Sequence, residues 1–207
     1  MLGQVDTLRA PVQQFVTLTG ARAASGYGTF VAAELAAGAV EHGGTVVGGG
    51  AYSIDAAAHR GALGAGGKTI AVLAGGLDKP YPAGNQELFN RIAARGALLS
   101  EIPPGCAPTK LRIMQRARLL AALSDTTVIV EAGFRSGSLL VAAHASAFGR
   151  DVGAVPGPIT SAYSSGAHDL LSSGTARIIT EPTTSRCRNL RPQAASMHPA
   201  LSRAARI

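Results

Sequence analysis

The chain has 207 residues, 46% of them hydrophobic and 15% charged, so it is long enough for one well-buried domain and is not an intrinsically disordered protein. A formal net charge of +7 and a pI near 10.1 indicate an anionic partner. The two cysteines show no pairing or metal-ligand spacing, and there is neither a signal-peptide core nor an uninterrupted apolar run of about 20 residues. These features predict a cytoplasmic protein that does not span a membrane.

The excess positive charge is concentrated near the C-terminus. Residues 183–207 hold five of the 19 basic residues and no acid, which leaves 14 basic against 12 acidic residues in the rest of the chain. This stretch contains Pro, Ser and Arg without periodicity, a composition typical of disorder. We therefore expect a short N-terminal segment at residues 1–14, one folded domain at residues 15–182, and a basic, disordered tail at residues 183–207.

Strand and helix patterns alternate from Phe15 onward. Short apolar runs bounded by glycines predict buried strands, and longer stretches with one apolar side predict helices. In chain order, the expected strands lie at about 15–19, 44–48, 69–74, 97–100, 126–130, 151–155 and 177–180, and the expected helices at about 29–42, 53–63, 85–95, 111–123, 138–148 and 168–172. This alternation predicts an α/β fold with a doubly wound, mostly parallel, Rossmann-like sheet.

The stretch Lys68–Pro82 holds the strand around which the other elements are expected to be arranged. Thr69–Ala74 is a continuous, largely apolar run that is too short for a typical helix, so it is predicted to be buried on both faces. Gly75 and Gly76 end this run without side chains, and the prolines that follow keep the loop from forming a helix. Another molecule can therefore approach the backbone here.

Each predicted strand is followed by a glycine-rich or polar cluster. These clusters are residues 20–28, 48–55 and 75–81, Glu101, residues 131–138, and residues 156–157. Since the carboxyl ends of parallel strands share one edge of a sheet, backbone amides from several loops gather there, and they favour phosphate groups. The spacing matches neither the dinucleotide fingerprint nor the Walker P-loop, so NAD and ATP are not the expected ligands.

Basic residues in two places are candidates for phosphate contacts. Arg22, just after the first strand, has a guanidinium that can bind a phosphate bidentately, although pairing with a surface carboxylate is equally compatible with its position. The segment with Lys110, Arg112, Arg116 and Arg118 has no acid between residues 102 and 124. It predicts either a solvated helix face or a stripe that follows a phosphate backbone.

Some acidic residues allow a catalytic interpretation. Asp55 and His59 are four residues apart and suit an acid/base pair, but a helix cap, for which Ser53 is also placed, and a structural histidine explain them at least as well. Asp78 and Glu131 are candidate carboxylates at adjacent strand ends, with no nucleophile near them in the sequence. Capping and turn formation are the simpler roles.

A series of ordered motifs resembles the DNA-processing protein A (DprA/Smf) family. The motifs extend from about Val16 to Ile179, and together they are far more specific than any one of them. They comprise Gly20-Ala-Arg22 with Ser25 and Tyr27-Gly28, Ile54-Asp-Ala-Ala-Ala-His59, Ile70 to Asp78 with Tyr81-Pro82 and Asn85, Leu99-Ser-Glu101, Arg116 and Arg118, Val130-Glu-Ala132 with Ser136-Gly-Ser138, Gly149-Arg150, and Ala154-Val-Pro-Gly157.

The resemblance implies a homodimeric single-stranded-DNA-binding protein with an extended Rossmann core. It further implies protection of incoming DNA in natural transformation, loading of a RecA-type recombinase, and no catalytic residue, metal or cofactor. Phosphates are the expected DNA contacts, with tyrosines such as Tyr27, Tyr52 and Tyr81 as candidate stacking surfaces. The DNA-binding residues that it implies are Gly20, Arg22, Ser25, Gly49, Lys110, Arg112, Arg116 and Arg118.

The sequence also departs from the family pattern. Tyr52 stands where many members have an arginine, and Ala117 stands where an asparagine between two arginines is usual. We expect neither the helical module that many members carry before the core nor a winged helix after Glu181. Two other functions remain open: a nucleotide-processing enzyme of the phosphoribohydrolase type, using Glu131, and a sensor that binds a small nucleotide without changing it.

Overall fold

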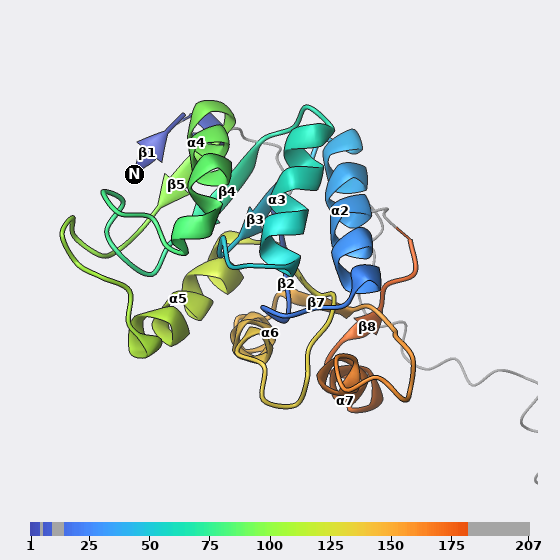
Figure 1. Cartoon of the computed structure of the whole chain (residues 1–207). Helices are drawn as coiled ribbons and strands as arrows, with labels where there is room; N and C mark the ends of the chain where they lie inside the picture. Colours follow the sequence, from blue (N-terminus) through green and yellow to red (C-terminus); the bar gives the residue numbers. More distant parts are fainter. Residues whose placement is uncertain (5, 10–14, 182–207) are drawn as a thin grey trace, which may run out of the picture.

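The computed structural model describes residues 1–4, 6–9 and 15–181 (Figure 1). The tail expected at residues 183–207 lies outside the described residues. Within the described part, one sheet has eight strands in the order β1-β5-β4-β3-β2-β6-β7-β8. They are β1 (Leu2–Gly3), β2 (Phe15–Thr19), β3 (Thr45–Gly48), β4 (Thr69–Val72), β5 (Ala97–Leu99), β6 (Thr126–Ile129), β7 (Asp151–Ala154) and β8 (Arg177–Ile178).

All neighbouring strands pair in parallel except β1 and β5, which are antiparallel. The prediction of an α/β, mostly parallel, Rossmann-like sheet is therefore confirmed. The first strand belongs to the same sheet, because Leu2 pairs with Leu98 and Gly3 with Ala97.

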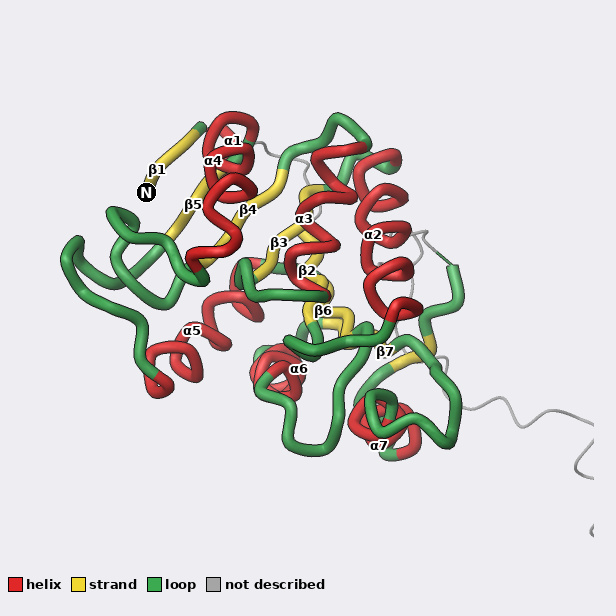
Figure 2. The backbone as a smooth tube through the Cα atoms, viewed as in Figure 1, coloured by secondary structure: helices red, strands yellow, loops and turns green. Residues whose placement is uncertain are grey.

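Helices cover both faces of the sheet. They are α1 (Asp6–Arg9), α2 (Gly26–Glu41), α3 (Ile54–Gly64), α4 (Gln86–Arg95), α5 (Lys110–Leu123), α6 (Ser138–Ala147) and α7 (Ser165–Ser172), with a short 3-10 turn, η1 (Ala83–Asn85), before α4. Figure 2 shows α2, α3 and α4 side by side on one face, with α5 and α6 on the other. Strands β2 to β7, which lie between these layers, are almost fully buried, as expected for parallel strands covered on both faces.

Small residues let α2 and α3 approach closely. A Cβ on Gly61 of α3 would overlap the backbone of Ala33 in α2, so only glycine fits there. On the opposite face, α5 is tied to the central strand, because the Thr17 hydroxyl donates to the Leu120 carbonyl at 3.0 Å and lies 2.7 Å from the Ser124 hydroxyl. These contacts fix α5 beneath β2.

Several predicted boundaries need correction. Helix α2 begins at Gly26 and not at Thr29, because the Ser25 side chain accepts a hydrogen bond from the Gly28 amide and caps the helix there. Strand β4 ends at Val72, two residues early, and α7 begins three residues early, at Ser165. The last strand covers only residues 177–178.

The strand order creates a crevice at the carboxyl edge of the sheet. From β2 the chain builds outward through β3, β4 and β5, and then crosses to the other side of β2 to form β6. The loops that follow β2 and β6 therefore leave toward opposite faces, and ligands of doubly wound sheets bind at such a reversal point. Among the residues that the structure describes, no helix has the length and apolar character needed to cross a bilayer.

Candidate functional site

A cavity of about 420 Å³ lies where β2 and β6 end. The loop after β2, the loop after β6 and one side of α5 line it. A small slot of about 30 Å³ adjoins the cavity and shares Arg22, Ala51, Ile113 and Arg116 with it. We call the cavity and slot together the trough: Arg22 and Arg116 lie in its middle, Tyr52 and Tyr81 line the slot end, and Arg135 and Tyr163 line the cavity end.

Buried Glu131 holds the loop that carries Arg22. Its carboxylate accepts hydrogen bonds from the Ser25 amide at 2.8 Å and the Ser25 hydroxyl at 2.6 Å, and its main-chain carbonyl accepts one from the Ala21 amide at 2.7 Å. A Cβ on Gly28 would overlap this carboxylate. The backbone on both sides of Arg22 is thus fixed. The Arg22 side chain is exposed and makes no hydrogen bond or ion pair within the described part of the chain.

Arg116 reaches from α5 to the ends of two strands. Its Nη1 donates to the Gly49 carbonyl at 2.6 Å and to the Val72 carbonyl at 3.2 Å. A Cβ on Gly49 would overlap the guanidinium, so glycine is needed for this approach. The Nε atom is buried and has no hydrogen-bond partner among the described residues. Burial lowers the pKa of Arg116, the nearby Asp55 opposes that effect, and Arg22 adds to it.

The Arg22 and Arg116 guanidinium groups therefore lie near one another with little negative charge to offset them. Asp55 is the one acid among the described residues that line the trough, and its oxygens are occupied by the Thr19 hydroxyl and by the Gly49 and Ala51 amides. The two guanidinium groups thus give the trough an excess of positive charge, which favours an anionic ligand.

The proposed acid/base pair of Asp55 and His59 is not formed. His59 is fully buried and its Nδ1 lies 2.7 Å from the Thr69 hydroxyl, whereas Asp55 binds Thr19 and the loop amides. Since the Thr69 hydroxyl donates its proton to the Val46 carbonyl, the imidazole donates through Nδ1. Burial lowers the pKa of His59 to about 3, so the ring is neutral near pH 7. His59 is a structural histidine.

The interpretation of Asp78 and Glu131 as carboxylates at adjacent strand ends is wrong. Strands β4 and β6, which precede them, are separated by β3 and β2. Asp78 is exposed and accepts a hydrogen bond from the Gly105 amide at 2.9 Å, so it shapes a loop. Ser53 occupies the N-cap position of α3, but its side chain makes no capping bond; its hydroxyl accepts from the Ala24 amide instead.

The residues predicted to bind DNA divide into two groups. Gly20, Arg22, Gly49 and Arg116 line the trough. Ser25, Lys110, Arg112 and Arg118 do not line it. Ser25 caps α2, and Lys110 is exposed at the start of α5. Arg112 donates to the Ala107 carbonyl at 2.6 Å, and the Arg118 Nη2 donates to both carboxylate oxygens of Glu101 at 2.7 Å.

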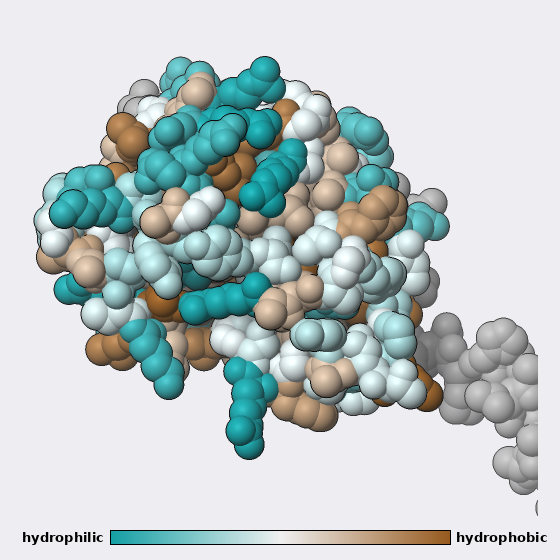
Figure 3. Space-filling model, viewed as in Figure 1, coloured by the Kyte–Doolittle hydropathy of each residue, from teal (hydrophilic) through white to brown (hydrophobic). Residues whose placement is uncertain are grey.

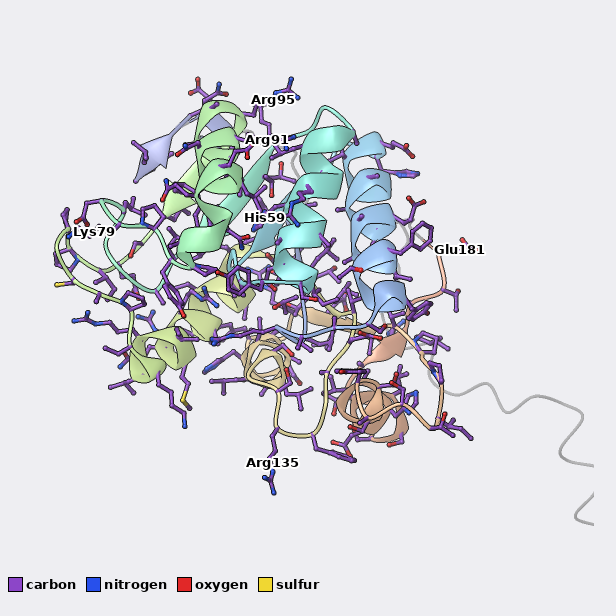
Figure 4. All side chains as sticks on the ribbon, viewed as in Figure 1. His59, Lys79, Arg91, Arg95, Arg135 and Glu181 are labelled. Carbon is purple, nitrogen blue, oxygen red and sulfur yellow. The ribbon has the colours of Figure 1, made fainter. Side chains whose placement is uncertain are left out.

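The sequence analysis missed Arg135 and Tyr163, which line the cavity end of the trough. Arg135 lies in the loop after β6, and its side chain extends away from the fold into solvent (Figure 4). Arg135 belongs to the polar cluster at residues 131–138, and this was the sequence signal that could have identified it. Figure 3 shows hydrophobic atoms over the start of α5, the helix that carries the exposed Leu111 and Met114.

Replacing Glu131 by alanine is expected to lower the free energy of unfolding by about 1–2 kcal/mol, because it leaves the partly buried Ser25 donors without their acceptor. Urea denaturation measures this change. The control is Glu34→Ala on the exposed side of α2, which is expected to change stability by less than about 0.5 kcal/mol. Equal stability of the two variants would contradict this role of Glu131.

The chain is similar to known DNA-processing proteins. A family model described as DNA recombination-mediator protein A matches residues 1–187. A putative DNA processing protein DprA of Mycobacterium tuberculosis is 55% identical over 163 residues, which are 79% of this chain and 42% of that protein. The chain thus spans less than half the length of this relative.

Two solved structures share the fold. The DNA processing protein A of Streptococcus pneumoniae matches with a TM-score of 0.84 and 36% identity, over 92% of this chain and 65% of that one. The protein of the same name from Helicobacter pylori, which binds single-stranded DNA, matches with a TM-score of 0.82 and 30% identity, over 91% of this chain and 84% of that one. The chain therefore belongs to the DNA recombination-mediator protein A family, whose members include the proteins called DprA and Smf.

Proposed function

We propose that the protein binds single-stranded DNA along the trough, mainly through phosphate contacts and with little readout of base sequence. The observation that carries this proposal is that Arg22 and Arg116 lie together in the trough, at the reversal point of the sheet. The Arg22 guanidinium is exposed and unpaired within the described part of the chain, and the Arg116 guanidinium is held in place by the Gly49 and Val72 carbonyls. A phosphodiester backbone supplies the missing negative charge.

The shape of the trough supports a flexible ligand. The cavity and slot are open and continuous, and they carry tyrosines as well as arginines. Proteins that bind single strands without sequence preference combine a positive groove with aromatic surfaces on which unpaired bases stack. The H. pylori relative binds single-stranded DNA and has the same fold, which further supports the proposal.

Binding is a better explanation of the site than catalysis. Asp55, His59 and Glu131, which an enzyme would need free to act, are each engaged in holding loops or strands together. We include in the proposal that the protein acts in the cytoplasm as a homodimer, protects incoming DNA and helps to load a RecA-type recombinase. Family membership supports these further roles.

The affinity for a single-stranded oligonucleotide is expected to fall steeply with salt. Three arginines line the trough, and neutralising three phosphates of a single strand gives a log–log slope of about −2. Fluorescence anisotropy with single-stranded and duplex oligonucleotides of the same sequence measures both the slope and the preference. We expect tighter binding of the single strand, because the duplex offers no unpaired bases.

The basic residues after Thr183 need a control, since five arginines there also attract DNA. The same salt titration with a chain that ends at residue 182 separates their contribution from that of the trough. A slope near zero for the shortened chain, or equal affinity for single and double strands, would contradict the proposal.

A further inference from the structure

Two exposed tyrosines border the slot end of the trough. Tyr52 and Tyr81 are 47% and 51% exposed, and they line the slot together with Arg22 and Arg116. A single exposed aromatic residue is unremarkable in a folded protein. Two on the rim of one slot, beside two guanidiniums, form a surface with the composition that unpaired nucleotides require.

The two tyrosines come from different loops that are tied together. Asn85, at the end of η1, donates from its side-chain amide to the Gly50 carbonyl at 3.0 Å and the Ala51 carbonyl at 3.4 Å. The Tyr52 hydroxyl lies against Gly84, where a Cβ would be only 2.7 Å from it. The loop of Tyr81 therefore holds the loop of Tyr52, so the Tyr52 ring is positioned before any ligand binds.

The Tyr52 loop is also tied to the loop that carries Arg22. Ser53 has a φ of 65°, a left-handed conformation that residues other than glycine rarely adopt. In this conformation its hydroxyl accepts a hydrogen bond from the Ala24 amide at 3.0 Å. The geometry thus couples the aromatic surface to the exposed guanidinium.

We propose that Tyr52 and Tyr81 form a base-stacking subsite, which takes an unpaired nucleobase while Arg22 and Arg116 hold its neighbouring phosphate. This inference rests on the proposed binding of single-stranded DNA. The slot, at about 30 Å³, is too small to enclose a base, so contact is with one face of the base and tolerates any sequence. Tyr27 has no such role, because it does not line the trough and its hydroxyl donates to the Pro156 carbonyl at 3.0 Å.

The test compares a single-stranded oligonucleotide with an otherwise identical one that carries abasic sites. Tyr52→Ala is expected to weaken binding of the ordinary oligonucleotide by about 5- to 30-fold and to leave binding of the abasic one nearly unchanged. Tyr81→Ala should show the same pattern, and Tyr52→Phe should retain binding since it keeps the ring. Phe30→Ala, which removes a 65% exposed ring from α2 outside the trough, is the matched control.

Three outcomes would overturn the inference. Unchanged affinity of both tyrosine variants, together with weakened binding by Arg22→Ala, would reject stacking while the proposed function stands. An equal loss for the ordinary and abasic oligonucleotides would show that the tyrosines only shape the loops. If the unmodified protein binds neither oligonucleotide, the proposed function fails and the subsite fails with it.

Discussion

Arg22→Ala is expected to weaken the binding of single-stranded DNA by about 10- to 100-fold, because a charge-assisted hydrogen bond to phosphate contributes about 1.5–3 kcal/mol. Arg22 has no partner within the described part of the chain, so its loss leaves no protein group unsatisfied and should leave the unfolding free energy nearly unchanged. All base sequences should be affected alike, and the salt slope should become less steep by about 0.7. Anisotropy titrations at several salt concentrations measure both quantities.

A matched control is Arg150→Ala. Arg150 immediately precedes β7 at the opposite edge of the sheet, where it pairs with Asp125 at 3.2 Å. The Arg150→Ala variant loses the same charge as Arg22→Ala, so any difference in DNA affinity between the two variants reflects the position of the charge and not the net charge. Undiminished binding by Arg22→Ala at moderate salt would reject the trough as the DNA site.

The free energy of unfolding is expected to fall as the pH falls below 6.5, by about 1.4 kcal/mol per pH unit, because of His59. Burial, with smaller contributions from Arg116 and Arg60, lowers the pKa of His59 from 6.5 to about 3. Between these values the imidazole is neutral in the folded protein and protonated in the unfolded chain. The unfolded state then binds the additional proton, so acid favours it, and this part of the stability is lost progressively down to about pH 3.

The clearest window for this measurement is pH 5 to 7, above the range in which unfolded carboxyl groups titrate. Urea denaturation across this window should show a loss of about 2 kcal/mol that His59→Gln removes, since that variant has no imidazole to protonate. The NMR signal of the His59 ring, which extends from α3 (Figure 4), should not titrate in the folded protein across this window. A midpoint near 6.5 would contradict the buried, neutral state.

The sequence alone determined the elements and the class of the fold. A run such as Thr69–Val72 or Thr126–Ile129 becomes a strand because of its own apolar, β-branched residues, and alternation with helices then requires a mostly parallel sheet. The glycine clusters and Arg22 could also be placed at the carboxyl edge, because that edge follows from strand direction. The residue patterns behind these predictions each span only a few neighbouring positions, so they can be recognised in the sequence.

Strand order and side-chain packing determine which of these residues act together. Strand order placed the loop of Gly20 beside that of Glu131 and separated Asp78 from it, although the sequence suggested adjacency. On α5, Arg116 turns toward Gly49 while Arg118, two residues later, pairs with Glu101. Such choices depend on contacts between segments far apart in the chain, and therefore on the free energy of the whole packed molecule, which no local pattern contains.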